Sequence, residues 1–475
     1  MQKIKKLFAP RDMTQGVPWK RIATFAVPML VGNFVQQLYN TVDSAVVGHY
    51  IGDGALAAVN GAMPVVFMLI VLFTGISTGA GIRVSQYFGA RDRENLSFVI
   101  GNCITLTALI SIVTMVLGTA LAYPLLHLLK SPLEIIGWTA DYLQIYFLGI
   151  SGFMYYNIFA GILRGMGDSL SALLFLLLSA TLNVVLDLLL VKPMGVAGVA
   201  LATILAQGIS AALCYLKLSR MKDTFDINRS TLKLKKEVVT DVVRLGLPSG
   251  ITQMTFSLAM LMVMRLENSF GVAFVASTSI VKRVDGYAMM PNFTFGMAMT
   301  TYIGQNVGAR RYDRLHTGAR QGMLLAVGTA TVLTGLILIF GRDIMHIFTE
   351  TKSVIDMSMR LMYILALGYI AMAVLQTMSG VMRGAGDTVT PMLISIGTSV
   401  FIRVTLAYLL VHLSKSPEYP DGRPEMIHVS LLLTWLIGAC INYLAYKYGR
   451  WRKKLPVDDG LSPDIPATYR KEKLS

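Results

Sequence analysis

The chain has 475 residues, of which 54% are hydrophobic and 15% charged, and its mean hydropathy is +0.59. This composition excludes an ordinary water-soluble globular protein and indicates that most of the chain lies in lipid. A formal net charge of +15 favours nucleic-acid binding in a soluble protein, so the position of the charges along the chain decides what they mean.

Long apolar stretches recur from Ile22 almost to the C-terminus. About 20 helical residues cross a hydrocarbon core of ~30 Å, and the stretch from Ser171 to Val191 lacks the alternation of outer-membrane barrel strands. We therefore predict an all-α integral membrane protein. Twelve transmembrane helices are expected, at residues 22–47, 56–80, 97–121, 134–158, 169–191, 195–218, 241–264, 272–300, 320–340, 357–380, 390–413 and 427–449.

The basic residues are distributed unevenly between the loops of these spans. If the N-terminus lies inside, most of the 42 Lys and Arg residues fall on the cytoplasmic side, as the positive-inside rule requires. We therefore expect a multi-pass protein of the inner (cytoplasmic) membrane with both termini in the cytoplasm, no cleaved signal peptide and no nucleic-acid partner. Only six basic residues are expected on the opposite face of the membrane: Lys130, Lys192, Arg342, Lys352, Lys415 and Arg423.

Two motifs occur twice at one constant offset. RGMGDS at residues 164–169 recurs as RGAGDT at 383–388, and QYFGAR at 86–91 recurs as QNVGAR at 305–310. Six spans per half make the halves parallel repeats, related by a pseudo-twofold axis along the membrane normal. We predict an N-terminal lobe at residues 1–218, a cytoplasmic linker at 219–240, a C-terminal lobe at 241–450 and a cytoplasmic tail at 451–475.

The repeated RGxGD[ST] motif falls in short turns between spans, where a structural role is favoured over phosphate binding. Glycine permits the turn, and Asp168 or Asp387 can cap the following helix. No phosphate-binding GxxxxGK[ST] motif and no metalloprotease HExxH motif occurs in the sequence.

Ionisable residues at membrane depth are costly and mark functional sites by default. In the first span, Gln36, Tyr39, Asn40 and Asp43 lie on one helical face. In the fifth span, Asn183 and Asp187 follow an i, i+4 spacing, and Thr203 of the sixth span adds a hydroxyl.

Two interpretations of these first-half residues stay open. Asp43, Asn183, Asp187 and Thr203 could form an oxygen-lined site for Na⁺, with the first three as ligands, or for a shared proton. Alternatively, the carboxylates are helix-end residues in water or hydrogen-bonded packing groups.

The second half lacks these acids and has Lys282, Arg283 and Asp285 instead. Lys282 and Asp285, at i, i+3, could form a structural salt bridge, and a role in substrate binding is an equal alternative. Glu267, at the end of the seventh span, is expected at the interface. Methionines and aromatic residues that line a cavity would suit apolar cations. The candidate substrate-contacting residues also include Asn40, Met154, Asn157 and Met289.

Several segments together resemble the multidrug and toxic compound extrusion family, in its prokaryotic branch related to the DNA-damage-inducible transporters. They are VPMLVGNFVQQLYNTVDSAVVG at 27–48, both QxxGAR and both RGxGD[ST] motifs, NVVLD at 183–187 and GVAGVALAT at 195–203. The similarity covers roughly residues 15–450.

The resemblance implies a V-shaped bundle of two six-helix lobes, expected as a monomer. It would be a secondary active antiporter that exports organic cations and other amphipathic compounds in exchange for H⁺ or Na⁺, with no other cofactor. It further implies that Asp43, Asn183, Asp187 and Thr203 form the cation-coupling site. Gln36 and Tyr39 would lie on the adjoining substrate wall, and Pro28 would be a hinge in the first helix.

Departures and alternatives accompany this resemblance. The acids that some branches carry in the seventh and tenth helices are replaced by Thr255, Phe256 and Gln376. A lipid-linked oligosaccharide flippase is the main alternative, because Lys282, Arg283 and Arg403 could bind a pyrophosphate. An integral-membrane transferase is more remote, because the six histidines are scattered singly.

Overall fold

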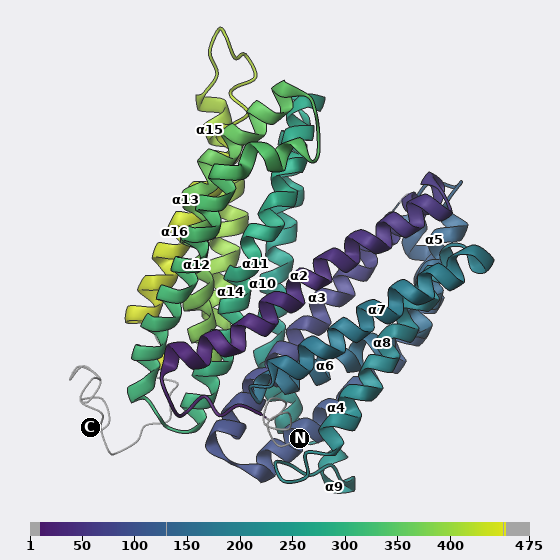
Figure 1. The fold of residues 1–475 in the computed structure, drawn as a ribbon, viewed down its shortest axis with the longest axis vertical. Coiled ribbons are helices and arrows are strands. Elements are labelled where there is room, and N and C mark those ends of the chain that lie inside the picture. The colour runs from purple at the N-terminus through teal and green to yellow at the C-terminus, as the bar shows by residue number, and fades with distance from the viewer. Residues whose placement is uncertain (1–9, 130, 450, 453–475) are drawn as a thin grey trace. The chain divides into compact units, whose positions relative to one another are not determined.

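The computed structural model describes residues 10–129, 131–449 and 451–452, and of residues 39–49, 53, 56, 64 and 72 only the backbone (Figure 1). Within this part of the chain every regular element is helical, apart from one isolated bridge between Ser416 and Tyr419. The predicted all-α class is therefore confirmed.

The chain divides into two compact units. Unit 1 comprises residues up to Arg11, Phe25–Val84 and Asp92–Met254. It contains most of α2 (Pro18–Tyr50) and α3 (Asp53–Ala90), followed by α4 (Arg93–Leu128), α5 (Ile136–Leu148), α6 (Ile150–Gly165), α7 (Ser169–Met194), α8 (Val196–Ser219), the short α9 (Arg229–Leu232) and the first part of α10 (Lys236–Asn268).

Unit 2 comprises Asp12–Thr24, Ser85–Arg91 and the chain from Thr255 onward. It contains the ends of α2, α3 and α10 that fall in these ranges. The helices that lie wholly within it are α11 (Val272–Gly308), α12 (Asp313–His346), α13 (Lys352–Gly384), α14 (Val389–Ser395), the π-helix η1 (Ile396–Ile402), α15 (Arg403–Leu413) and α16 (Met426–Tyr448).

Nine helices in the described residues are long and apolar enough to cross a membrane, and the pair α5 and α6, bent by 53°, would make a tenth. The predicted span at 134–158 is therefore two helices that meet at Gly149. The predicted span at 272–300 corresponds to α11, a more polar helix that carries Lys282, Arg283 and Asp285. The twelve-span, two-lobe layout and its domain boundaries stay predictions.

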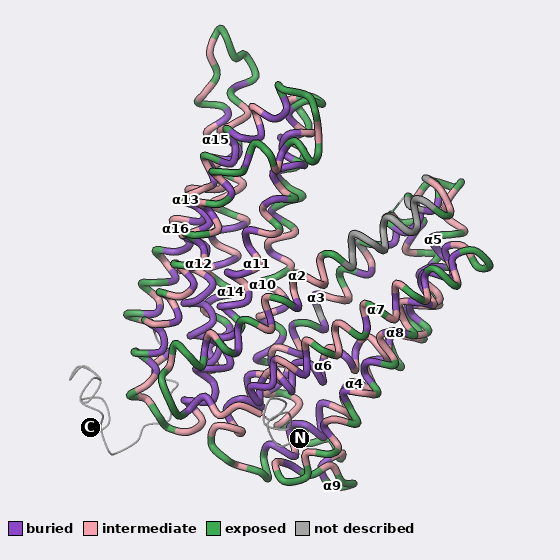
Figure 2. Tube along the Cα trace, viewed as in Figure 1, coloured by how far each residue is buried: buried purple, intermediate pink, exposed green. Residues whose placement is uncertain are grey.

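Exposed apolar residues on α4 show how these helices suit a lipid environment. They recur at helical spacing on one side of the helix, where water would make a continuous apolar stripe unfavourable. Their exposed fractions lie between 48% and 58%, and they are Leu109, Ile112, Val113, Val116 and Leu117. In unit 2, by contrast, α11 is buried along much of its length (Figure 2).

The repeated QxxGAR motifs contact each other within unit 2. A Cβ atom on Gly89 would lie 1.9 Å from the carbonyl oxygen of Gln305, and one on Gly308 would lie 1.7 Å from that of Gln86. Only glycine permits so close an approach of two helix backbones. In both motifs the final arginine adopts a left-handed φ, of 54° and 55°. The sequence repeat is thus also a repeat of structure.

The RGxGD[ST] turns have the structural role predicted for them. Gly167 and Gly386 have φ values of 82° and 92°, which side chains rarely adopt. Asp168 caps α7 by accepting a hydrogen bond from the backbone N–H three residues later at 3.0 Å. Asp387 accepts one from the hydroxyl three residues later at 2.7 Å.

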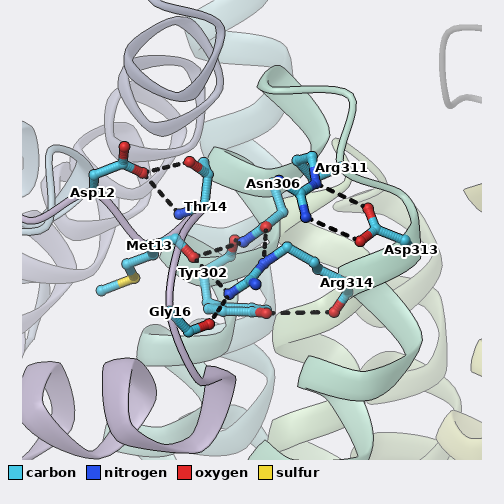
Figure 3. A network of polar contacts seen from close by, with 9 residues as sticks. All are labelled: Asp12, Met13, Thr14, Gly16, Tyr302, Asn306, Arg311, Asp313 and Arg314. Atoms are coloured by element: carbon cyan, nitrogen blue, oxygen red, sulfur yellow. Dashed lines mark hydrogen bonds and ion pairs between the residues drawn. The ribbon is translucent and has the colours of Figure 1, made fainter.

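The N-terminal segment Asp12–Gly16 is held against α11 and the start of α12 in unit 2 (Figure 3). The side-chain oxygen of Gln305 accepts a hydrogen bond from the backbone N–H of Met13 at 2.9 Å. Arg314 donates to the carbonyl oxygen of Gly16 at 2.7 Å. These bonds satisfy backbone groups that have no helical partner and fix the chain just before α2 begins.

Candidate functional site

Unit 1 contains a buried polar cluster between α7 and α8. Asn183 and Asp187, one turn apart on α7, have exposed fractions of 2% and 0%. Asn183 Nδ2 donates a hydrogen bond to Thr203 Oγ1 of α8 at 3.1 Å, and Thr203 donates to the carbonyl oxygen of Val199 at 3.0 Å. The structure therefore brings together three of the four residues predicted to couple a cation.

A tight turn between the two helices makes this contact possible. Gly195, with φ 58°, ends α7 and begins α8. A Cβ atom on Gly198 would lie 2.4 Å from the carbonyl oxygen of Leu190, so glycine is needed for the close packing of α7 and α8. The fragment GVAGVALAT thus positions Thr203 opposite Asn183.

Further polar residues, not predicted from the sequence, lie on the same helices. Ser179 precedes Asn183 by one turn and is 3% exposed. On α8, Gln207 and Ser210 follow Thr203 at i+4 and i+7, and among the described residues Gln207 Oε1 and Ser210 Oγ are buried without a hydrogen-bond partner. Helical spacing from Thr203 could have revealed them. The buried oxygen-rich surface is therefore longer than predicted.

The contribution of the first predicted span is only partly described. The side chains of Tyr39, Asn40 and Asp43 lie outside the described residues. Gln36 is half-buried on α2, and Pro28 lies within that helix, which runs without interruption from Pro18 to Tyr50. The roles assigned to these five residues stay predictions.

Residues predicted from the fourth span form packing contacts. Met154 is 1% exposed and belongs to the apolar core of unit 1. Asn157 donates to the carbonyl oxygen of Phe153 in its own helix at 2.9 Å, and its own carbonyl oxygen accepts a hydrogen bond from Ser77 of α3 at 2.7 Å. Substrate binding by Met154 and Asn157 stays a prediction.

A second polar cluster lies in unit 2. Its described side chains do not form the Lys282–Asp285 salt bridge that the i, i+3 spacing allowed. Lys282 Nζ lies 2.6 Å from a carboxylate oxygen of Glu267 on α10, while Asp285 accepts a hydrogen bond from the hydroxyl of Tyr369 on α13. Glu267 is only 6% exposed, so it is buried rather than interfacial. Lys282 and Asp285 therefore have separate partners.

Two further residues extend this cluster and were missed as partners in the sequence. Arg403, at the start of α15, interacts electrostatically with Glu267 and Asp285. His428 of α16 is 4% exposed and lies close enough to Lys282 and Arg403 to interact with them electrostatically. Its ring packs edge-on against Phe274. These partners come from helices distant in sequence, so no local spacing could reveal them.

The other second-half candidates are placed differently. Arg283 is exposed, and its guanidinium lies 5.9 Å from the ring centre of Phe348. Met289 is buried in the core of unit 2, where its sulfur lies 3.8 Å from Asn292 Nδ2. A substrate-binding role for Arg283, Met289, Lys282 or Asp285 stays a prediction.

The family model named MatE matches residues 28–189 and 248–409, one match in each half. Over 447 residues the chain is 29% identical to the "Probable multidrug resistance protein YoeA" of Bacillus subtilis (strain 168), with 92% of this chain and 95% of that protein covered. Over 450 residues it is 25% identical to the "Probable multidrug resistance protein NorM" of Thermotoga maritima, with 92% and 93% covered.

Solved structures show the same fold. One, described as the outward-facing conformation of a multidrug resistance MATE family transporter, matches with a TM-score of 0.85 at 24% identity, covering 93% of this chain and 98% of the other. The names of these relatives do not favour the flippase alternative. That alternative needs basic residues to bind a pyrophosphate, whereas Lys282 pairs with Glu267. The chain belongs to the MatE family of multidrug and toxic compound extrusion proteins and is a multi-pass membrane transporter, not an enzyme.

Proposed function

We propose that this protein is a secondary active exporter of organic cations and other amphipathic compounds, driven by entry of H⁺ or Na⁺. The observation that carries the proposal is the complete burial of Asp187 beside Asn183 in α7. A charged carboxylate buried in a membrane-spanning helix is costly unless it is paired or neutralised. Binding a proton or Na⁺ offsets that cost, so the occupancy of the site can bias the conformation of unit 1.

The chemistry of the cluster fits a hard cation. Asn183 and Thr203 add an amide oxygen and a hydroxyl to the carboxylate, which are ligands that Na⁺ and other hard cations prefer. Asp43, predicted on the polar stripe of the first span, would supply the second carboxylate. Neither α7 nor α8 has a Lys or Arg among its buried residues, so the buried surface of this described helix pair suits positive charge.

The same proposal includes the orientation and setting of the chain. The excess of Lys and Arg in the linker and the terminal segments supports an orientation with both termini in the cytoplasm and a location in the inner membrane. We propose a monomer, with Pro28 as the point where α2 bends when the coupling site changes occupancy. Proline removes one backbone hydrogen bond from the helix interior and so lowers the cost of bending there.

The test is dye efflux from proteoliposomes with a pH gradient or a Na⁺ gradient, each imposed alone. We expect ethidium efflux from the wild type with one gradient. Asp187→Asn, which keeps the size of the side chain, should lower the driven rate by at least about tenfold. The matched control is Glu418→Gln, which removes a carboxylate from an exposed loop and should leave the rate unchanged.

Two results would overturn the proposal. Efflux that depends on neither gradient would reject coupled antiport. Wild-type rates in correctly inserted Asp187→Asn and Asp43→Asn variants would remove the first-half cluster from the coupling mechanism.

A further inference from the structure

Unit 1 has a groove of about 610 Å³ that is separate from the α7–α8 cluster. Its walls come from α4, α6 and α8, and the linker residues Ile227 and Leu232 border one end. No Lys, Arg, Asp or Glu is among the described residues that line it. The groove is therefore an apolar recess in a membrane-spanning unit.

The length of the groove matches one leaflet of a bilayer. On α8 the lining runs from Ile204 to Tyr215, a distance of about 16 Å at 1.5 Å per residue. Half of a ~30 Å hydrocarbon core is ~15 Å. An occupant would therefore extend from the membrane surface at the linker end to the bilayer centre, as a single acyl chain does.

The floor of the groove is formed by small residues. A Cβ atom on Gly152 of α6 would lie 2.8 Å from the backbone of Gly208 on α8, so the two helices cross in close contact there. A Cβ atom on Gly208 itself would meet nothing within 4 Å, because it would project into the groove. This narrow, smooth floor fits an unbranched chain.

The wall near the linker is aromatic. Phe159 stacks on Tyr155 with ring centres 5.4 Å apart and contacts Tyr215 at 5.9 Å. The hydroxyl of Tyr155 donates to the carbonyl oxygen of Ile104 at 3.1 Å, which leaves its ring face for apolar contact. Aromatic side chains at this level are typical of the boundary between lipid chains and headgroups.

The linker fixes basic residues beside the mouth of the groove. Thr105 Oγ1 donates to the carbonyl oxygen of Leu232 at 2.7 Å, and the backbone N–H of Lys235 donates to Asn102 at 2.7 Å. Arg229, on the same short helix as Leu232, and Lys233, the residue that follows it, are exposed. A basic rim above an apolar groove is complementary to an anionic lipid.

We propose that this groove binds an anionic phospholipid of the cytoplasmic leaflet, with one acyl chain along α8 and the phosphate at Arg229 and Lys233. The orientation is that of the proposed function, but the binding requires no transport. Bound lipid would join α4, α6 and α8 to the linker and so stabilise the cytoplasmic end of unit 1.

The test is native mass spectrometry of the full chain, released from nanodiscs that contain equal amounts of phosphatidylglycerol and phosphatidylcholine. We expect the wild type to retain one phosphatidylglycerol. Gly208→Leu should fill the groove and lower that retention by at least about tenfold. Its control is Gly328→Leu on α12, where a Cβ atom also meets nothing within 4 Å; it should retain the lipid.

A second pair of variants separates the headgroup from the chain. Arg229→Gln combined with Lys233→Gln should abolish the preference for phosphatidylglycerol over phosphatidylcholine, a change of about tenfold or more for two surface cations. Lys352→Gln combined with Lys415→Gln, on the face predicted to be external, should preserve it. Asp187→Asn should retain the lipid, which keeps this test independent of the coupling mechanism.

Wild-type retention by Gly208→Leu would overturn the proposal. So would displacement of the lipid by ethidium in the wild type, because the groove would then be a site for transported compounds.

Discussion

The crossing of the two QxxGAR motifs allows a sharp test of the repeat as a structural element. In Gly308→Ala, the new methyl carbon would lie 1.7 Å from the carbonyl oxygen of Gln86. Non-bonded heavy atoms prefer separations of ~3.5–4.0 Å, so the backbones of α3 and α11 would have to part by roughly 2 Å. Neither the new methyl carbon nor the carbonyl oxygen of Gln86 can rotate away, because each is attached directly to a helix backbone.

Overpacking of this kind costs about 1–3 kcal/mol where side chains can adjust, and a backbone contact lies at the upper end of that range. We expect an apparent Tm at least about 4 °C below that of the wild type, measured by intrinsic fluorescence of the detergent-purified protein. Gly89→Ala, with its contact at 1.9 Å from Gln305, should behave alike because the two glycines occupy equivalent positions.

The matched control is Gly335→Ala within α12, where a Cβ atom would meet nothing within 4 Å. Alanine in a helix interior is favoured over glycine by ~0.5–1 kcal/mol, so this variant should be as stable as the wild type or slightly more stable. If Gly308→Ala and Gly89→Ala unfold at the same temperature as Gly335→Ala, then the close crossing of the repeats is refuted.

Two further predictions concern polar contacts in unit 2. Arg314→Ala should release the segment before α2 and speed its cleavage by trypsin, because charged hydrogen bonds contribute about 1.5–3 kcal/mol each; Arg320→Ala, an exposed residue of the same helix, should not. Glu267→Gln should lower the apparent Tm by more than Asp356→Asn does, because Glu267 is buried beside Lys282 whereas Asp356 forms an exposed ion pair. Equal melting temperatures of the last two variants would contradict the importance of burial.

Local periodicity predicted those features of the site that a single helix determines. The i, i+4 spacing of Asn183 and Asp187 placed both on one face, and the structure buries both on α7. Glycines in the RGxGD[ST] motifs indicated turns between helices, as at Gly167 and Gly386. Such features follow from the backbone geometry of neighbouring residues, so the sequence contains them directly.

Contacts between distant helices could not be predicted in this way. Lys282 and Asp285 have the spacing of an ion pair, but Glu267 and Tyr369 bind them instead. The choice depends on how α10 and α13 pack against α11, which no local pattern encodes. The bend at Gly149 has a similar origin, because a Cβ atom there would meet the side chain of Ile204 at 2.3 Å.

The differences between the halves matter more for mechanism than their similarity. The repeats share glycine crossings and capped turns, which any stable membrane lobe requires. At the positions equivalent to Asn183 and Asp187, however, the second half has Ile402 and Leu406. There the continuous α7 is replaced by α14, the π-helix η1 and α15, and π-helical segments occur often at functional sites.

The two polar clusters should therefore respond differently to a cation. In unit 2 the acids Glu267 and Asp285 lie close to the bases Lys282 and Arg403. The negative and positive charges of that cluster are therefore equal in number before any cation binds. On the buried faces of α7 and α8 the only charged residue described is Asp187, among amides and hydroxyls. One proton or one Na⁺ changes the net charge of that surface completely. The proposed coupling therefore predicts an occupancy-dependent rearrangement in unit 1, where a bound cation changes the local charge most.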